Sequence, residues 1–213
     1  MTHWAMVIDL TCCIGCKSCI SACSLANGVS EGLWRKLDEL EVPQPPERER
    51  LFATRSCMHC EDPPCKIVCP TGATFQRADG IVEIDYEKCV GCGYCIVACP
   101  YDARAIFRYH HCFEADTPLM QESERKAQEN REGVCTKCDF CVNRIEDGQK
   151  KNLRPGIDPD ATPLCVTTCS SGALSFGDLD DLQSHIPQMI RDRHAIQIFD
   201  QLETNPSVYY IIS

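Results

Sequence analysis

Regularly spaced cysteines are the residues of this sequence that could do chemistry. Residues 89–100 read C-V-G-C-G-Y-C-I-V-A-C-P, so four cysteines have the spacing C-x2-C-x2-C-x3-C and a proline follows. This run is a signature of iron–sulfur ligation in which three thiolates bind one cluster and the fourth binds another. Gly91 and Gly93 allow the loop to fold closely around a cluster. The run therefore predicts a partner motif elsewhere in the chain.

Further groups of cysteines have related spacings. One has the same short gaps, and two have a longer gap before a final C-x3-C that is followed by x-x-G-A. In chain order, the groups are Cys13, Cys16, Cys19 and Cys23; Cys57, Cys60, Cys65 and Cys69; Cys89, Cys92, Cys95 and Cys99; and Cys135, Cys138, Cys141, Cys165 and Cys169. The order short, long, short, long predicts two ferredoxin-like units, each built from one short-gap and one long-gap motif.

The composition excludes several classes of protein. A net charge of -10 over 213 residues argues against nucleic-acid binding. The 19 cysteines could indicate a disulfide scaffold, but they are odd in number and lie too close together to bridge easily. The first ten residues have no basic region before an apolar run, so we predict no signal peptide. No stretch reaches 18 apolar residues, so we expect no membrane span.

Structural zinc is the alternative to iron, because all-cysteine zinc sites also use C-x2-C. Such sites pair two C-x2-C knuckles and do not need three cysteines at successive x2 spacings, so the pattern favours iron. Four groups of four ligands suit four [4Fe-4S] clusters, which transfer single electrons. The chain has no Walker loop, dinucleotide fingerprint or G-x-S-x-G elbow, and we predict no catalytic residue.

Other polar residues lie near the predicted ligands. His59 stands between two cysteines, and we expect it to form a hydrogen bond rather than to bind metal. Lys88, Arg104, Lys137 and Arg144 are also close in sequence to ligands. Their charges would raise cluster potentials if they are buried, whereas solvated surface positions would have little effect; the sequence leaves both interpretations open.

Short elements are expected to position the cysteines. We predict strands over 5–10, 51–55, 73–77, 81–84, 103–108, 173–176 and 208–212. We predict helices over 17–26, 143–149 and 178–191, the last capped by Asp178 or Asp180 and kinked at Pro187. Residues 40–50 hold three prolines and five charges, which predicts a surface excursion, and 109–134 is predicted to be a surface insertion.

Several stretches resemble the four-cluster ferredoxin subunit, or beta subunit, of molybdopterin oxidoreductases of the dimethyl sulfoxide reductase family. Besides the run at 89–100, they are V-I-D-L-T-C-C-I-G-C at 7–16, C-M-H-C-E-D-P-P-C at 57–65, C-P-T-G-A at 69–73, K-C-D-F-C-V-N-R at 137–144, S-F-G-D-L-D-D at 175–181 and P-S-V-Y-Y at 206–210. The family pattern K-C-x-x-C-x-x-R lands on Cys138 and Cys141, not on Cys135.

The resemblance also implies that ligands are exchanged within two pairs of motifs. Site 1 would be Cys13, Cys16, Cys19 and Cys169; site 2 would be Cys57, Cys60, Cys65 and Cys99; site 3 would be Cys89, Cys92, Cys95 and Cys69; and site 4 would be Cys138, Cys141, Cys165 and Cys23. Cys12, Cys112 and Cys135 remain as free thiols, unless two of them form a disulfide in an oxidising compartment.

The expected fold is α+β, with two bacterial-ferredoxin-like units intertwined in one chain. An outer unit would comprise 1–50 and 135–213, an inner unit 51–108, and an insertion 109–134. The expected function is to relay electrons between a molybdopterin catalytic subunit, with molybdenum or tungsten, and a membrane anchor with its quinone pool or a soluble carrier.

Two alternatives remain: the same relay in a hydrogenase or formate dehydrogenase complex, and a structural zinc-binding interaction protein. The relay would work at the cytoplasmic or periplasmic face of a prokaryotic membrane.

Overall fold

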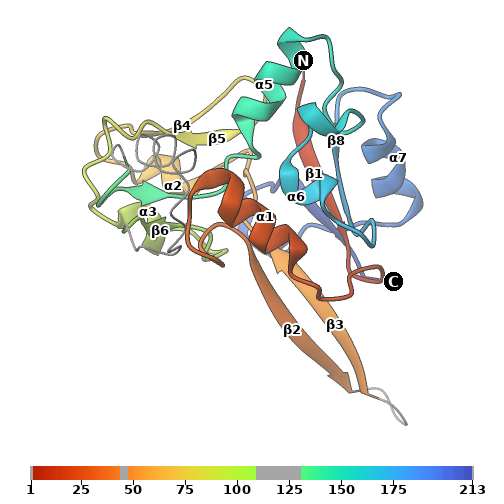
Figure 1. The fold of residues 1–213 in the computed structure, drawn as a ribbon. Coiled ribbons are helices and arrows are strands. Elements are labelled where there is room, and N and C mark those ends of the chain that lie inside the picture. The colour runs from red at the N-terminus through yellow and green to blue at the C-terminus, as the bar shows by residue number, and fades with distance from the viewer. Residues whose placement is uncertain (1, 44–47, 109–130, 213) are drawn as a thin grey trace, which may run out of the picture.

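The computed structural model describes residues 2–43, 48–108 and 131–212, and its arrangement is shown in Figure 1. The helices are α1 (Ser18–Asn27), α2 (Pro64–Ile67), α3 (Tyr94–Val97), α5 (Val142–Lys150), η1 (Pro159–Ala161), α6 (Leu164–Thr167), α7 (His185–Asp192) and η2 (Asp200–Leu202). The strands are β1 (Trp4–Asp9), β2 (Lys36–Pro43), β3 (Arg48–Arg55), β4 (Thr74–Gln76), β5 (Val82–Ile84), β6 (Ala105–Ile106), β7 (Cys135–Thr136), β8 (Leu174–Asp178) and β9 (Val208–Ile211). Cys112 and most of the predicted insertion lie outside the described residues.

The strand β1 is the centre of the largest sheet, whose order is β8-β1-β9. It pairs antiparallel with β8 and parallel with β9, and every one of its six residues is buried. Alternate side chains of a strand point to opposite faces. Met6 and Ile8 accordingly join the main core, whereas Ala5 and Val7 pack with Ile186 of α7. The predicted strands at 5–10, 173–176 and 208–212 are thus confirmed, with small shifts at their ends.

Residues 40–50 are not the irregular excursion that the sequence predicts. β2 and β3 form an antiparallel ribbon in continuous register from the pair Lys36↔Arg55 to the pair Pro43↔Arg48. The ribbon extends away from the body of the molecule (Figure 1). The charges that suggested a loop pair across the strands, as between Arg50 and Glu39 at 2.9 Å. Cross-strand pairs of opposite charge favour the ribbon even where both faces are polar.

The helix predicted over 178–191 is also shorter than expected. Asp178 ends β8, and its Oδ1 accepts a hydrogen bond from the backbone N–H of His3 at 2.8 Å. α7 begins after Ser184, whose Oγ accepts from the N–H of Ile186. Pro187 therefore lies in the first turn, where a missing N–H costs no helical hydrogen bond and no kink is required.

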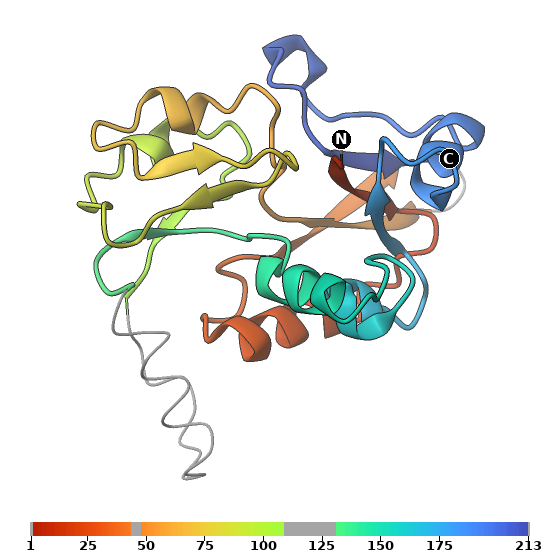
Figure 2. The same ribbon diagram turned by 90° about the horizontal axis from the view of Figure 1, so that it is seen from above.

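The remaining elements are short and hold the cysteine loops between them. β4 and β5 form the predicted hairpin, α5 forms at the predicted place, and α1 ends at Gly28 in the left-handed conformation. β6 pairs with β7, and this pairing joins the chain on either side of 109–130. Figure 2 shows α2, α3, β4 and β5 on one side of the molecule and the β8-β1-β9 sheet with α7 on the other. The fold is α+β, as predicted.

Candidate metal centres

The two short-gap motifs have the same backbone shape. Gly15 and Gly91 both have positive φ, at 70° and 67°. Lys17 and Gly93 are the left-handed N-caps of α1 and α3, with φ of 62° and 80°. The chain therefore turns twice in each motif before a helix begins. A side chain at Gly91 would also collide with the backbone oxygen of Gly133. The internal repeat predicted from spacing is thus a repeat of local structure.

The two long-gap motifs match each other as well. α2 and α6 each have four residues and follow an extended proline, Pro63 or Pro163. Cys65 and Cys165 are buried in these helices. Proline suits the start of a helix because the first N–H groups have no helical partner. Sequences with little similarity in the gaps thus place one cysteine in a short helix and the next just beyond it.

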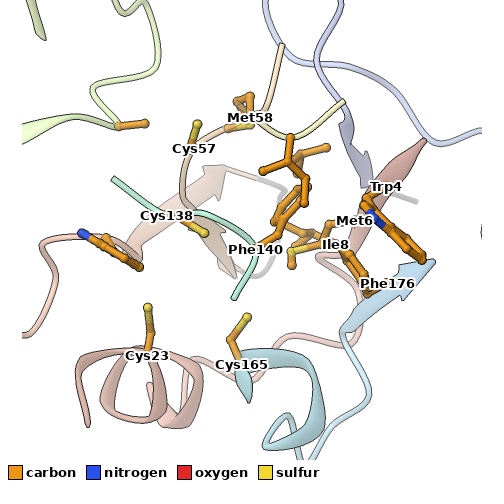
Figure 3. Packing of buried hydrophobic residues seen from close by; sticks show 14 of the residues in the cluster. Trp4, Met6, Ile8, Cys23, Cys57, Met58, Cys138, Phe140, Cys165 and Phe176 are labelled. Atoms are coloured by element: carbon orange, nitrogen blue, oxygen red, sulfur yellow. The ribbon is translucent and has the colours of Figure 1, made fainter. Parts of the chain in front are cut away.

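Site 4 surrounds an interior space. Among the described residues, no three Cys, His, Asp or Glu side chains converge on a position for a single metal ion. The four predicted ligands of site 4 instead line a space of about 270 Å³; they are Cys23, Cys138, Cys141 and Cys165. Figure 3 shows Cys23 on α1 and Cys165 on α6 pointing toward Cys138. Four thiols around a common space are the donor set that a [4Fe-4S] cluster requires.

The thiols of site 4 are strongly affected by burial. Burial raises the pKa of Cys23 to about 12, and the charges of Cys165 and Cys141 add to this shift. The pKa of Cys141 is raised to about 12 for the same reason. The metal-free thiols therefore hold their protons at neutral pH. Cluster ligands are thiolates, so cluster assembly must release these protons and supply the countercharge that keeps the sulfurs ionised.

Site 1 unites residues from opposite ends of the chain. Burial raises the pKa of Cys13, and the charges of Cys169 and Cys16 raise it further. Cys169 and Cys165 act on Cys19 in the same way, again after burial. These interactions place Cys169 beside the first motif, as the predicted ligand exchange requires. They also place site 1 next to site 4, because Cys165 belongs to site 4.

Site 2 includes a cysteine from beyond α3. Burial raises the pKa of Cys60 to about 12, and the charges of Cys57, Cys65 and Cys99 contribute. All of the cysteines from the second motif in this set are buried, and Cys99 is partly buried. Cys99 thus lies with the second motif, although it follows Cys95 by only four residues.

Site 3 has less direct support from individual contacts. Cys69 Sγ accepts a hydrogen bond from the N–H of Thr74 at 3.4 Å, and Cys89 Sγ accepts one from the N–H of Cys135 at 3.4 Å. α2, which precedes Cys69, packs against α3, which carries Cys95. The two parts of the site are therefore neighbours. Donors from the backbone to ligand sulfur are a common way to stabilise a reduced cluster.

Cys135 has a place that the sequence did not reveal. It is buried, and its Sγ lies 3.4 Å from Sγ of Cys95. A cluster ligand is a thiolate and has no proton, so Cys135 must be the donor of an S–H···S hydrogen bond when Cys95 is a ligand. This contact lowers the pKa of Cys95 to about 6. Cys135 is therefore a hydrogen-bond donor to site 3. Cys12 is exposed, and the structure does not describe Cys112.

We expect Cys135→Ala to lower the midpoint potential of the cluster at site 3. The donor stabilises the extra negative charge of the reduced cluster, and a hydrogen bond worth about 1 kcal/mol corresponds to about 40 mV for one electron. Redox titration followed by electron paramagnetic resonance would measure the shift. Cys135→Ser keeps a donor and is the matched control. Equal potentials in wild type and Cys135→Ala would contradict this role.

The four cations near ligands in sequence prove to be of two kinds. Lys88 is exposed and pairs with Asp85, and Arg144 binds the carbonyls of Thr162 and Pro159. Lys137 and Arg104 are instead buried. A fifth cation, Arg35, is also buried beside cysteines and was not predicted from the sequence. Arg35 lies outside every cysteine motif, so spacing gives no signal for it.

His59 is buried between sites 2 and 4. Its Nδ1 accepts a hydrogen bond from the N–H of Val82 at 3.1 Å, so Nε2 carries the proton of the neutral ring. The ring stacks on Phe140, with centroids 3.8 Å apart. Burial lowers the pKa of His59 well below its usual value, and the charges of Lys137 and Arg104 contribute. The expected hydrogen-bonding role of His59 agrees with these contacts.

Comparison with known proteins gives the family. A family model described as a 4Fe-4S dicluster domain matches residues 49–116. The putative dimethyl sulfoxide reductase iron-sulfur subunit of Halobacterium salinarum is 39% identical over 227 residues, which cover 99% of this chain and 79% of that protein. The chain belongs to the iron–sulfur subunits of the dimethyl sulfoxide reductase family of molybdopterin oxidoreductases. Its resemblance to these subunits is thereby confirmed.

Other relatives of this iron–sulfur subunit have similar coverage. A selenate reductase subunit of Mesobacillus selenatarsenatis is 38% identical over 222 residues, covering 98% of this chain and 72% of that protein. A tetrathionate reductase subunit of Salmonella typhimurium is 38% identical over 214 residues, with the same two shares, 98% and 72%.

The family defines the chemistry of the chain. The iron–sulfur subunit carries multiple [4Fe-4S] clusters and transfers electrons within an oxidoreductase complex that has a separate catalytic subunit. Within the described ranges, none of its helices has the length and apolar character needed to cross a bilayer.

Proposed function

We propose that the iron–sulfur subunit relays single electrons through four [4Fe-4S] clusters held at sites 1 to 4. One end of the relay would meet a molybdopterin catalytic subunit, and the other a membrane anchor with its quinone pool. The proposal rests on the gathering of the site 1, site 2 and site 4 cysteines into separate sets, each with a ligand from a distant motif. In each set the thiolates would hold the iron, and the surrounding backbone and apolar side chains would exclude water.

Exposure of the cysteines suggests the order of the sites. Among the described cysteines assigned to sites, Cys16 of site 1 and Cys92 of site 3 are exposed, whereas sites 2 and 4 each contain three buried cysteines. Site 1 adjoins site 4 through Cys19 and Cys165. Arg104 faces cysteines of both site 2 and site 3. These neighbours support the linear order 1, 4, 2, 3, with one partner at each exposed end.

The same contacts support the two ferredoxin-like units. α1 packs on α6, and β1 pairs with β8 and β9, so the first and last parts of the chain are joined. α2 packs on α3 within the inner segment. β3, however, crosses the boundary that we drew between residues 50 and 51. We propose that the units remain as inferred, with the β2–β3 ribbon connecting them.

The metal content tests the proposal against structural zinc. Protein purified without oxygen should be brown, with about sixteen irons per chain from four cubanes of four irons each, and reduction should produce paramagnetic clusters. Elemental analysis and electron paramagnetic resonance would provide the measurement. A colourless protein with stoichiometric zinc would refute the relay. A hydrogenase or formate dehydrogenase complex would instead be recognised from the catalytic subunit that co-purifies with the chain.

The site 3 end has an apolar surface suited to a partner. Ile67 of α2 and Val97 of α3 are 82% and 89% exposed, and Val90 and Tyr94 beside Cys92 are also exposed. Exposed apolar patches next to a site mark interfaces more often than isolated residues do. We propose that one of the two partner subunits covers this surface. The complex would lie on the cytoplasmic or periplasmic face of the membrane, on the side where its catalytic subunit is found.

We expect Val97→Glu to detach that partner without loss of iron. A buried, unpaired carboxylate at an interface opposes association, and Val97 itself contributes little to the interior of the chain. Co-purification of the complex from membranes would be measured, and the missing subunit would identify the partner at the site 3 end. Leu182→Glu, at another exposed position, is the control. Retention of both partners by Val97→Glu would contradict the assignment.

A further inference from the structure

Two arginines are buried in this molecule without an acidic partner. Arg35 is 1% exposed and Arg104 is 3% exposed. Within the described part of the chain, the ion pairs of the arginines involve other residues, such as Arg55 with Asp38 and Arg77 with Glu146. Arginine does not lose its proton in proteins, so each of these two side chains is a fixed positive charge. A buried charge without a countercharge is strongly unfavourable.

Cysteines of the proposed sites surround both arginines. Burial by itself would lower the pKa of Arg35, but the facing thiolates outweigh burial and raise it; they are Cys165, Cys138, Cys19 and Cys23. The same balance holds for the pKa of Arg104, and its facing cysteines are Cys65, Cys57, Cys135 and Cys95. Arg35 thus adjoins sites 1 and 4, and Arg104 adjoins sites 2 and 3. The two arginines have equivalent places in the two pairs of sites.

Hydroxyl side chains hold the two guanidinium groups in similar ways. Arg35 Nη1 donates to Oγ1 of Thr54 at 3.2 Å, and this oxygen lies 3.8 Å from Sγ of Cys19. Arg104 Nη1 donates to Oγ1 of Thr74 at 3.0 Å, and the backbone N–H of Thr74 donates to Sγ of Cys69 at 3.4 Å. In each case a threonine touches both the arginine and a predicted ligand.

Each guanidinium also has a nitrogen that remains without a partner. Among the buried side-chain atoms of the described residues, Nε of Arg35 and Nη2 of Arg104 form no hydrogen bond. Arg35 lines the space enclosed by the site 4 cysteines. Lys137 differs, because its Nζ donates to the carbonyl oxygens of Val82 and Cys138. The orphaned nitrogens are donors that cluster or thiolate sulfur would satisfy.

We propose that Arg35 and Arg104 are fixed countercharges, each placed between the two clusters of one pair, which stabilise an electron on either cluster of that pair. This inference rests on the proposed four-cluster relay. A cluster with four thiolates is an anion and gains one more negative charge on reduction, so an adjacent cation raises its potential. When the electron moves to the other cluster of the pair, the first is oxidised, the second is reduced, and the same cation remains adjacent.

Redox titration of the anaerobically purified subunit tests the proposal. In Arg35→Met, we expect two of the clusters to be harder to reduce, with at least a tenfold fall in the ratio of reduced to oxidised cluster at the wild-type midpoint, or about 59 mV for one electron. Arg104→Met should shift the other two clusters, and the double variant should shift all four. Arg35→Lys keeps the charge and should keep the wild-type potentials. Arg55→Met, which removes an arginine paired with Asp38, is the control and should change none.

The outcomes separate this proposal from its premise. Unchanged potentials in Arg35→Met and Arg104→Met with full iron content would overturn the proposal and leave the relay intact. Loss of iron in Arg35→Met but not in Arg35→Lys would support a requirement for charge. Loss of iron in both would show a packing role and overturn the proposal. Wild-type protein without iron or cluster signals would overturn the proposed relay itself.

Discussion

Replacing Cys99 by serine should remove or convert the cluster bound by Cys57, Cys60 and Cys65, and should spare the cluster of the adjacent Cys89–Cys95 loop. The charge of Cys99 acts on Cys60 and Cys65 in the structure, although Cys99 follows the third motif in sequence. A serine oxygen is a harder donor than thiolate and binds iron–sulfur clusters poorly. The expected effect is therefore large and limited to one site.

Matched variants identify the site that changes. Cys60→Ser should give the same altered paramagnetic spectrum as Cys99→Ser, whereas Cys92→Ser should give a different one. Iron content should fall by at most about a quarter, the share of one cluster among four. A Cys99→Ser spectrum identical to that of Cys92→Ser would contradict the exchange of ligands between motifs.

Removal of iron should abolish the folded structure of the subunit. α2, α3 and α6 have only four residues each, and helices this short do not form without tertiary support. Arg35 and Arg104 would also lose their countercharge. Uncompensating one buried charge costs about 3–5 kcal/mol, so two such losses approach the roughly 5–15 kcal/mol that typically stabilises a domain. The free energy of cluster binding is therefore a large part of the free energy of folding.

Circular dichroism would measure this effect under reducing, anaerobic conditions. Iron-depleted protein should lose its near-ultraviolet signal and its cooperative unfolding transition, and reconstitution with iron and sulfide should restore both. A sample taken through the same steps without chelator controls for damage by handling. A metal-free chain with a native spectrum and a cooperative transition would show that the apolar core suffices for folding.

Local patterns were enough to predict the motifs and most of the short elements. The repeat of cysteine spacings predicted paired loops, and Gly15 and Gly91 do take the same positive φ. The apolar run at 5–10 became a central strand, since a strand buried on both faces needs apolar side chains throughout. The prolines and charges at 40–50 led to a wrong prediction, because the sequence does not show that Glu39 and Arg50 face each other across a ribbon.

The donor chemistry of this protein follows from its amino-acid sequence alone, because thiolate ligation requires cysteines at spacings that a short loop can bring together. What surrounds those donors depends on the tertiary fold. Arg35 lies outside every cysteine motif, and Cys135 follows Cys95 by 40 positions, yet both border predicted clusters. Contacts between residues so distant in sequence arise from the packing of α1, β3 and β7 against the cysteine loops, and spacing carries no record of them.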